Sequence, residues 1–458
     1  MNEHEHDEGH WLDRTIHQVR AMGPLLPIMA VVFIGYLVVG AAMPAVPLHV
    51  HEGLGQGAFI VGLVAGAQFA AALISRIWAG QHADIRGGKR TVVIGLVAAA
   101  VAGLLFLLSL RFVAEPDTSV TILLLGRALH GGAQSFIVGG AVVWGLALLG
   151  PQNTGKILAW VGIAVYAALA VGAPAGTTLY ADHGFAAIAL ATTLTALGAL
   201  PLAVSIRSVA PAPAAKASLT RVARAVWVPG IGLALSGVGF GAITTFIVLL
   251  FADRGWALAW IAYTALSVAF MGGRVVFGHL PDKIGGAKVA LVCVLIEAAG
   301  LALIWFAPWP ELALVGAALT GFGYSLVYPG FGVEAVRRAP PQSRGLAMGA
   351  YTAFFDLSLG ITSPLLGLIA GEAGQGAVFL ASALLVFCAA PIALRLSCAA
   401  PPSHDAAGES TGGRNEASFR RGSAAHRREG QTPPRTDAGW GSRGGSPNRA
   451  GTNPRAPA

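Results

Sequence analysis

Charged residues are scarce in this chain, and cysteines are scarcer still. Asp, Glu, Lys and Arg make up only 11% of the 458 residues, whereas soluble domains carry about 25%. This shortage argues against a soluble protein. The three cysteines, Cys293, Cys388 and Cys398, stand far apart and predict neither a disulfide framework nor a metal centre. The net charge of +8 lies largely outside the apolar runs, which argues against nucleic-acid binding.

Long apolar runs are abundant instead. The chain is 55% hydrophobic, and its 61 glycines suit close helix packing in lipid. Runs of about 20 apolar residues cross a bilayer, and in lipid they must be helical so that every backbone group finds a partner. The sequence therefore predicts an all-α integral membrane protein with twelve transmembrane helices, at 25–48, 58–80, 91–113, 119–145, 157–180, 185–206, 228–252, 257–278, 289–307, 311–333, 345–370 and 377–395.

The basic residues predict how these spans are oriented. With the N-terminus inside, the inner loops hold thirteen Lys and Arg residues and the outer loops only Arg111 and Arg254. The positive-inside rule then places both termini in the cytoplasm. Residues 1–22 carry both signs of charge and predict a cytoplasmic leader, and 207–226 predict a cytoplasmic linker. Residues 396–458 have few aliphatic side chains and predict a disordered basic tail that can contact lipid headgroups.

One motif occurs twice, in gaps between apolar runs. Arg-x3-Gly-x3-Asp-x2-Gly-Gly begins at Arg76 and again 198 residues later at Arg274. We expect both copies at the cytoplasmic rim, where the aspartates can face an arginine or a helix N-terminus and the glycines can form tight turns. The motif predicts a conformational gate made of Arg76, Gly80, Asp84, Gly87, Arg90, Arg274, Gly278, Asp282 and Gly285.

A second repeat indicates an internal duplication. Residues 126–135 align with 316–325 at an offset of 190, which also pairs Pro174 with Pro364 and Tyr166 with Asp356. The chain therefore reads as two parallel six-helix repeats, an N-terminal bundle at 23–206 and a C-terminal bundle at 227–395. Because the polar residues differ between the copies, we expect one central site to which the repeats contribute unequally.

Two charged residues inside the spans are the candidates for proton coupling. Asp356 lies eleven residues into its span, about 16 Å along the helix and near the midplane, where a carboxyl group is typical of proton exchange. Arg127 lies about two turns inside a span and is functional by default. The alternatives are a permanent Asp–Arg pair and a structural Arg127. Glu297 is open between transport and pairing with Arg274.

Further residues complete the candidate site. His130 and Gln134 share the helix face of Arg127, although His130 can equally be a packing residue. Prolines and small residues in spans 5 and 11 predict bent, closely packed helices. The helix-kink candidates are Gly172, Pro174, Gly176 and Pro364, and the substrate-cavity candidates are Tyr36, His130, Gln134, Tyr166, Phe240, Thr244, Tyr324 and Tyr328.

These motifs resemble those of the major facilitator superfamily over the twelve spans, about 370 residues without the tail. Gly80…Asp84…Gly87 looks like the family's loop 2–3 signature, and the segment from Arg127 to Gly131 looks like its span-4 motif, which is associated with proton handling. Residues 73–80, 126–136, 172–176 and 356–360 resemble the bacterial YhhS-type, drug/proton antiporter-like branch. The chain departs from the family where Ile85 replaces a basic residue and where Ala173 precedes Pro174.

The resemblance implies a secondary transporter of the bacterial inner membrane. We expect a monomer that exports small amphipathic molecules by proton antiport and alternating access, with protons and membrane lipids as its other partners. No Walker motif points to nucleotide use, and we expect no cofactor, no metal and no enzyme activity. A proton symporter that imports a sugar or an organic anion is one alternative. A non-transporting membrane receptor or scaffold, supported only by the tail, is the other.

Overall fold

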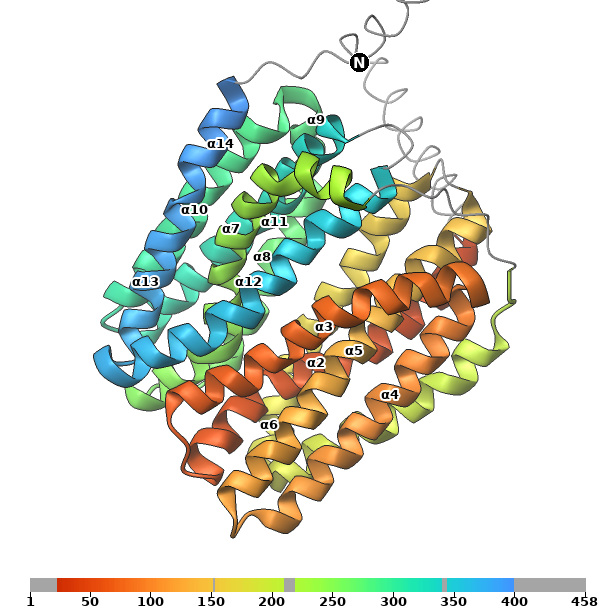
Figure 1. The fold of residues 1–458 in the computed structure, drawn as a ribbon. Helices are drawn as coiled ribbons and strands as arrows, with labels where there is room; N and C mark the ends of the chain where they lie inside the picture. The colour runs from red at the N-terminus through yellow and green to blue at the C-terminus, as the bar shows by residue number, and fades with distance from the viewer. Residues whose placement is uncertain (1–22, 151–152, 210–218, 340–343, 399–458) are drawn as a thin grey trace, which may run out of the picture. The chain divides into compact units, whose positions relative to one another are not determined.

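The computed structural model describes residues 23–150, 153–209, 219–339 and 344–398. The predicted leader, the middle of the linker and nearly all of the predicted tail lie outside these ranges. Every regular element within them is a helix (Figure 1). The elements are η1 Gly23–Leu25, α2 Leu26–Leu48, η2 His49–Gly53, α3 Ala58–Arg86, α4 Gly88–Ser109, η3 Leu110–Phe112, α5 Pro116–Leu149, α6 Thr154–Ser205, α7 Leu219–Asp253, α8 Trp260–Phe277, α9 Leu280–Ile284, α10 Gly286–Phe306, α11 Pro310–Arg338, α12 Arg344–Ala373, α13 Gln375–Phe387 and α14 Ala389–Cys398.

Eleven helical stretches in the described ranges are long and apolar enough to cross a membrane. One of them, Trp160–Ser205, has 46 residues and is broken at Gly184, whose φ of 71° and ψ of −171° are not helical. Each arm of α6 is long enough to span a bilayer. The predicted spans 157–180 and 185–206 therefore correspond to two helices that meet at Gly184 and share the label α6.

Several helices are longer than their apolar runs. Helix α3 continues through the first gate motif to Arg86, so Arg76, Gly80 and Asp84 are helical and not in a loop. Helix α7 begins at Leu219, so residues 219–226 of the predicted linker are helical. The last predicted span is divided at Cys388 between α13 and α14. Polar residues can extend a membrane helix into water, which is why the hydropathy boundaries fall short.

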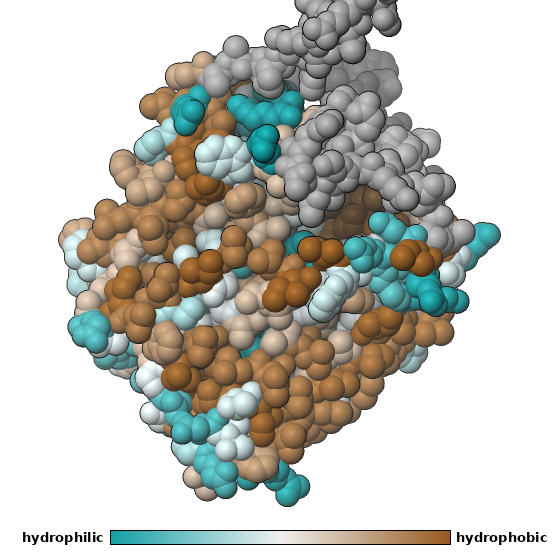
Figure 2. All heavy atoms as spheres, viewed as in Figure 1, coloured by the Kyte–Doolittle hydropathy of each residue, from teal (hydrophilic) through white to brown (hydrophobic). Residues whose placement is uncertain are grey.

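The surface suits a lipid environment. Hydrophobic residues cover most of the face seen in Figure 2, and hydrophilic residues gather mainly toward its margins. Large apolar side chains are exposed on many helices, for example Trp78 at 63%, Leu194 at 63% and Val275 at 70%. An apolar surface of this extent is a membrane-facing surface.

Two stretches of chain, called here the N-terminal segment (23–206) and the C-terminal segment (219–398), meet mainly through three helix pairs. Within the N-terminal segment α2 packs on α6, α4 on α5 and α6, and α3 on α5. Within the C-terminal segment α7 packs on α12, α10 on α11 and α13, and α8 on α11. The main pairs that join the segments are α3 with α12, α6 with α8 and α2 with α7, and Figure 1 shows α3 alongside α12.

Candidate functional site

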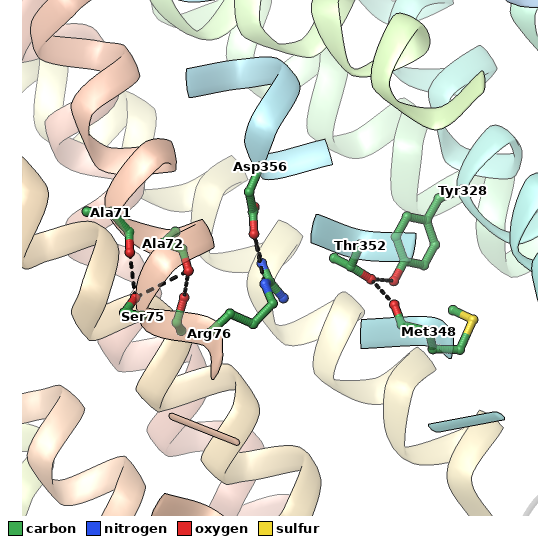
Figure 3. Close-up of polar contacts among 9 residues, drawn as sticks. Ala71, Ala72, Ser75, Arg76, Tyr328, Met348, Thr352 and Asp356 are labelled. Carbon is green, nitrogen blue, oxygen red and sulfur yellow. Dashed lines mark hydrogen bonds and ion pairs between the residues drawn. The ribbon is translucent and has the colours of Figure 1, made fainter. Parts of the chain in front are cut away.

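An ion pair joins α3 to α12 (Figure 3). The Nε atom of Arg76 donates to Oδ2 of Asp356 at 2.8 Å, and Nη2 donates to the same oxygen. The Asp356 side chain is 5% exposed and that of Arg76 is 32% exposed. The other two ion pairs in the described ranges lie within α11. The Arg76–Asp356 pair is therefore the one that holds the N-terminal and C-terminal segments together by charge.

This pairing differs from the sequence interpretation. Asp356 and Arg127 were the two proton-coupling candidates and Arg76 was assigned to a rim gate, but the residue that pairs with Asp356 is Arg76. The reason is the length of α3, which runs ten residues beyond Arg76 to Arg86, about 15 Å. Arg76 thus lies well inside the helix, beside the middle of α12. An Asp–Arg pair at Asp356, as in the alternative given above, is thus present in this structure, and whether it is permanent stays a prediction.

Helices α3 and α12 approach each other closely on one side of the ion pair. A Cβ atom on Gly66 would lie 2.9 Å from the Gly360 carbonyl oxygen and 3.0 Å from Cδ of Pro364. Gly62 likewise faces Ser363 and Pro364, and Gly367 faces Ala58. Higher numbers on α3 meet lower numbers on α12, so the helices are antiparallel. We call this contact the α3–α12 seam, and Arg76–Asp356 lies beyond its Gly66–Gly360 end.

A small hydrogen-bonded group lies on α11 and α12 near the ion pair. The hydroxyls of Tyr328 and Thr352 are 2.9 Å apart, and Thr352 also donates to the Met348 carbonyl at 2.8 Å. Tyr351 donates to the Tyr328 carbonyl at 2.8 Å. In Figure 3 Tyr328 and Thr352 lie to one side of Asp356, with Ser75 on the other. These bonds fix the Tyr328 ring between α11 and α12.

An aromatic cluster occupies the region where α6, α7, α8, α11 and α12 meet. Tyr166 stacks on Phe270 with ring centroids 3.6 Å apart and an interplanar angle of 16°. Tyr324 lies 5.8 Å from Phe270, and Phe240 lies 6.3 Å from Tyr166. Phe355 is 5.8 Å from Tyr324. Three cavity candidates are thus brought together, Tyr166, Phe240 and Tyr324. The sequence interpretation missed Phe270 and Phe355, although Phe270 lies one helical turn before Arg274.

Arg274 lies at the edge of this cluster. Its guanidinium carbon is 5.1 Å from the Phe270 ring centroid and 5.5 Å from that of Tyr328. Among the described residues Arg274 makes no ion pair and no side-chain hydrogen bond to another residue. Tyr36, another cavity candidate, lies near Arg76 and Asp356 and packs with α2 against the apolar core.

Arg127 lies apart from Asp356, in a buried polar group of the N-terminal segment. It is 4% exposed, and its Nε and Nη1 atoms have no hydrogen-bond partner. It lines a small pocket with Thr244 of α7 and with Met43 and Phe69. His130 and Gln134 are also buried, and His130 packs edge-on against Phe106 at 6.1 Å. Three cavity candidates, His130, Gln134 and Thr244, are therefore outside the aromatic cluster.

Glu297 is fully buried at 0% exposure in the C-terminal segment. Ser236 of α7 donates to its Oε2 atom, and Oε1 has no partner. The alternative in which Glu297 pairs with Arg274 is wrong, because Arg274 lies over aromatic rings. In the described ranges no group of three or more His, Cys, Asp or Glu residues could hold a metal ion.

The two copies of the gate motif end their helices in a similar way. Gly87 has φ 89° and Gly285 has φ 101°, a backbone region that glycine adopts without strain. Asp84 and Asp282 are exposed and make no ion pair with a described residue. Arg90 is exposed at the start of α4, and Gly80 and Gly278 are partly buried. The gating role of this motif stays a prediction.

The kink candidates lie where helices pack. Gly172 and Gly176 face Gly40 and Ala41 of α2, as the expected close packing requires. Pro174 lies inside α6, and Pro364 lies inside α12 at the α3–α12 seam.

Comparison with known proteins fits this arrangement. The sequence profile of the Major Facilitator Superfamily matches residues 28–295 and 230–441, so the second match extends into the region we expected to lie outside the resemblance. An MFS-type transporter of Salmonella typhimurium is 41% identical over 359 residues, which cover 78% of this chain and 92% of the relative. An MFS-type transporter of Burkholderia pseudomallei is 41% identical over 373 residues, 81% of this chain and 90% of the relative.

Solved structures show the same fold at low identity. The nucleoside transporter NupG superposes with a TM-score of 0.66 at 14% identity, over 82% of this chain and all of that one. The human organic anion transporter MFSD10 superposes with a TM-score of 0.58 at 14% identity, over 81% of this chain and 99% of that one. On the profile match and the 41% identical relatives, this chain belongs to the Major Facilitator Superfamily and is a multi-pass membrane protein that acts as a secondary transporter.

Proposed function

We propose that the chain is a proton-coupled exporter of small amphipathic molecules in the bacterial inner membrane. It works as a monomer by alternating access, with both termini in the cytoplasm. The motifs at residues 73–80, 126–136, 172–176 and 356–360 favour the YhhS-type branch of the family. The bacterial relatives favour a bacterial membrane.

The packing supports two parallel six-helix repeats as the moving bodies. Helix α2 packs on α6 as α7 packs on α12, α4 on α5 as α10 on α11, and α3 on α5 as α8 on α11. The crossings between the segments are then the crossings between the two repeats. In transporters built of such repeats, one bundle rocks against the other around a fixed site near the midplane.

The observation that carries the proposal is the Arg76–Asp356 ion pair across this interface. When Asp356 takes up a proton, its negative charge is removed and the attraction to Arg76 is lost. The two helices can then separate at that point, and loss of the proton restores the pair. A charge pair with a buried carboxylate that breaks on protonation is a two-state element of the kind that couples a gradient to a conformational change.

The remaining candidates have supporting roles in the proposal. The aromatic cluster binds the apolar body of the substrate. Asp84 and Asp282 bridge the two bundles in the opposite state and are released in this one. Arg127, with His130 and Gln134, forms a second polar group that assists proton coupling within the N-terminal bundle.

Compound retention in bacteria tests the proposal. Wild type, Asp356→Asn and Arg76→Gln would be expressed in an export-deficient host and offered dyes, antimicrobials, sugars and organic acids, with and without a protonophore. We expect wild type to exclude at least one compound, and the protonophore and both variants to abolish that exclusion. Glu297→Gln is the matched control because it neutralises a buried carboxyl group that is not part of the Arg76–Asp356 pair, and it should transport normally.

Other results would replace the proposal. Gradient-driven accumulation of a compound would favour the symporter. Unchanged transport in Asp356→Asn would remove Asp356 from the coupling path. Deleting residues 399–458 addresses the receptor or scaffold reading, since a transporter should keep its flux without them, whereas a scaffold built on the tail should lose its activity.

A further inference from the structure

Two arginines occupy matching places at the crossings between the segments. Arg76 and Arg274 begin the two copies of the same motif. The second repeat, with its offset of 190 residues, aligns Tyr166 with Asp356. Arg76 meets Asp356 where α3 crosses α12. Arg274 of α8 lies beside α6, where a Cβ atom on Gly162, one helical turn before Tyr166, would be 3.3 Å from its Nη1 atom. The two crossings therefore match in position and differ in charge.

Arg274 has no carboxylate at its crossing. Where Asp356 neutralises Arg76, the matching residue is the neutral phenol of Tyr166. Arg274 is partly buried, and its contacts among the described residues are with the faces of Phe270 and Tyr328. Ring faces attract the cation, but they leave its planar N–H donors available. A guanidinium with free donors in a low-dielectric site strongly favours a carboxylate, which it can bind through two parallel hydrogen bonds.

The rings beside Arg274 favour a flat apolar body on the same ligand. Phe270 is stacked with Tyr166, and Tyr328 is fixed by its bond to Thr352. Aromatic rings held in this way are suited to packing against another ring. Asp356 is paired with Arg76, and Ser236 donates to Glu297, so neither carboxyl group forms an ion pair with Arg274. Arg274 therefore suits a ligand with one negative charge.

We propose that Arg274 binds the carboxylate of a small aromatic monoanion, and that the ligand's ring packs against Phe270, Tyr166 and Tyr328. The substrate carboxylate then does at the α6–α8 crossing what Asp356 does at the α3–α12 crossing. This inference rests on the proposed transport function, and it names the substrate class of that site.

Ligand binding to the purified full-length protein in detergent tests the inference without requiring transport. The probes are 2-naphthoate and benzoate, their uncharged amides, and acetate and chloride as anions without a ring. We expect wild type to bind 2-naphthoate, and to bind 2-naphthamide, acetate and chloride at least tenfold more weakly. Arg274→Gln should weaken 2-naphthoate binding roughly tenfold to a hundredfold, the range for a lost charged hydrogen bond.

A substitution at Tyr166 tests the inference more directly than Arg274→Gln does. Tyr166→Asp supplies the missing carboxylate from within the protein, so it should pair with Arg274 and weaken 2-naphthoate binding by a similar factor. The control is Arg111→Gln, at an exposed arginine outside the site, which should bind 2-naphthoate as wild type does within about threefold. If Arg274→Gln fails to fold, Tyr166→Asp still tests the inference. It would create at the α6–α8 crossing the kind of charge pair that Arg76 and Asp356 form at the α3–α12 crossing.

Several results would overturn the inference. These are no binding of either carboxylate, equal binding of 2-naphthamide, tight binding of chloride alone, or undiminished binding in both Arg274→Gln and Tyr166→Asp. Flux in proteoliposomes with a pH gradient separates this inference from the proposed function. If 2-naphthoate binds through Arg274 but no gradient moves it, the transport proposal fails and the site stands. If other compounds are exported and no carboxylate binds, the site fails and the transport proposal stands.

Discussion

Arg76 and Asp356 are 280 positions apart in the chain, and two side-chain hydrogen bonds join them across α3 and α12. We expect Asp356→Asn to lower the free energy of unfolding by about 3 kcal/mol, because it leaves Arg76 charged and without its partner. Arg76→Gln should have a similar effect. The double variant should cost clearly less than the sum of the two, since it leaves no unpaired charge.

Thermal unfolding of the four proteins in one detergent measures this coupling. Additive losses in the double variant would mean that the two side chains do not interact in the folded protein. The charge-swapped variant Arg76→Asp with Asp356→Arg serves as a positive control, and it should recover part of the lost stability because it keeps both charges at the same crossing.

Replacing Arg127 should change the stability of the folded protein in the opposite direction to replacing Asp356. Its buried Nε and Nη1 atoms have no hydrogen-bond partner in this state, so the unpaired charge lowers stability. We expect Arg127→Met to raise the melting temperature by a few degrees and to reduce gradient-driven transport at least tenfold, the trade-off typical of a functional polar group. Melting in detergent and flux in proteoliposomes give the two readings. A variant that melts lower would indicate that Arg127 is structural.

The α3–α12 seam should keep Ser363 inaccessible. Ser363 is 0% exposed, and a side chain on Gly66 would collide with the backbone of α12. In a protein whose three native cysteines are replaced by alanine, Ser363→Cys should react slowly with a water-soluble maleimide. Adding Gly66→Leu should speed the labelling at least tenfold by forcing the helices apart.

The matched control for the seam is Gly371→Leu. Gly371 is also on α12, but a Cβ atom added there would have no neighbour within 4 Å, so labelling should stay slow. Equal labelling of the Gly66→Leu and Gly371→Leu proteins would show that the seam does not seal this face.

The break in α6 should depend on glycine. The φ of 71° and ψ of −171° at Gly184 belong to a region almost restricted to glycine. Gly184→Ala should therefore cost about 1–3 kcal/mol, seen as a lower melting temperature in detergent. Gly198 lies in the same helix with open space around it and without a positive φ. Gly198→Ala should be neutral or slightly stabilising, and a similar loss in both variants would contradict the argument from backbone conformation.

Apolar length located the membrane helices well and their ends poorly. Hydropathy marks the part of a helix that needs lipid, so it stopped near Gly80, whereas α3 continues to Arg86. The same error put Arg76 near the end of its predicted span, at the cytoplasmic rim, and hid its contact with Asp356. Kinks are equally invisible to hydropathy, and the two arms of α6 were correctly separated only because polar residues surround Gly184.

Pairing between distant helices was the harder part of the site. Asp356 stood out because a carboxyl group inside a span is rare, but its partner depended on how α3 crosses α12, and no local pattern records that angle. The aromatic residues Tyr166, Phe240 and Tyr324 were predicted to line one cavity, and their rings do meet in the structure. The surroundings of Arg127 and His130 could not be predicted, because a shared helix face does not say which helix packs against it.

The seam also has a mechanical consequence. Glycine contacts hold the backbones of α3 and α12 together near Gly66 and Gly360, and Arg76 lies ten residues farther along α3, about 15 Å away. The close contact of the seam can thus serve as a pivot, and the part of α3 between Gly66 and Arg76 enlarges the displacement that a rotation produces. A turn of only about 20° about it would carry Arg76 sideways by about 5 Å, well past the 2.8 Å hydrogen bond to Asp356. A shallow tilt is thereby converted into the complete making or breaking of one bond.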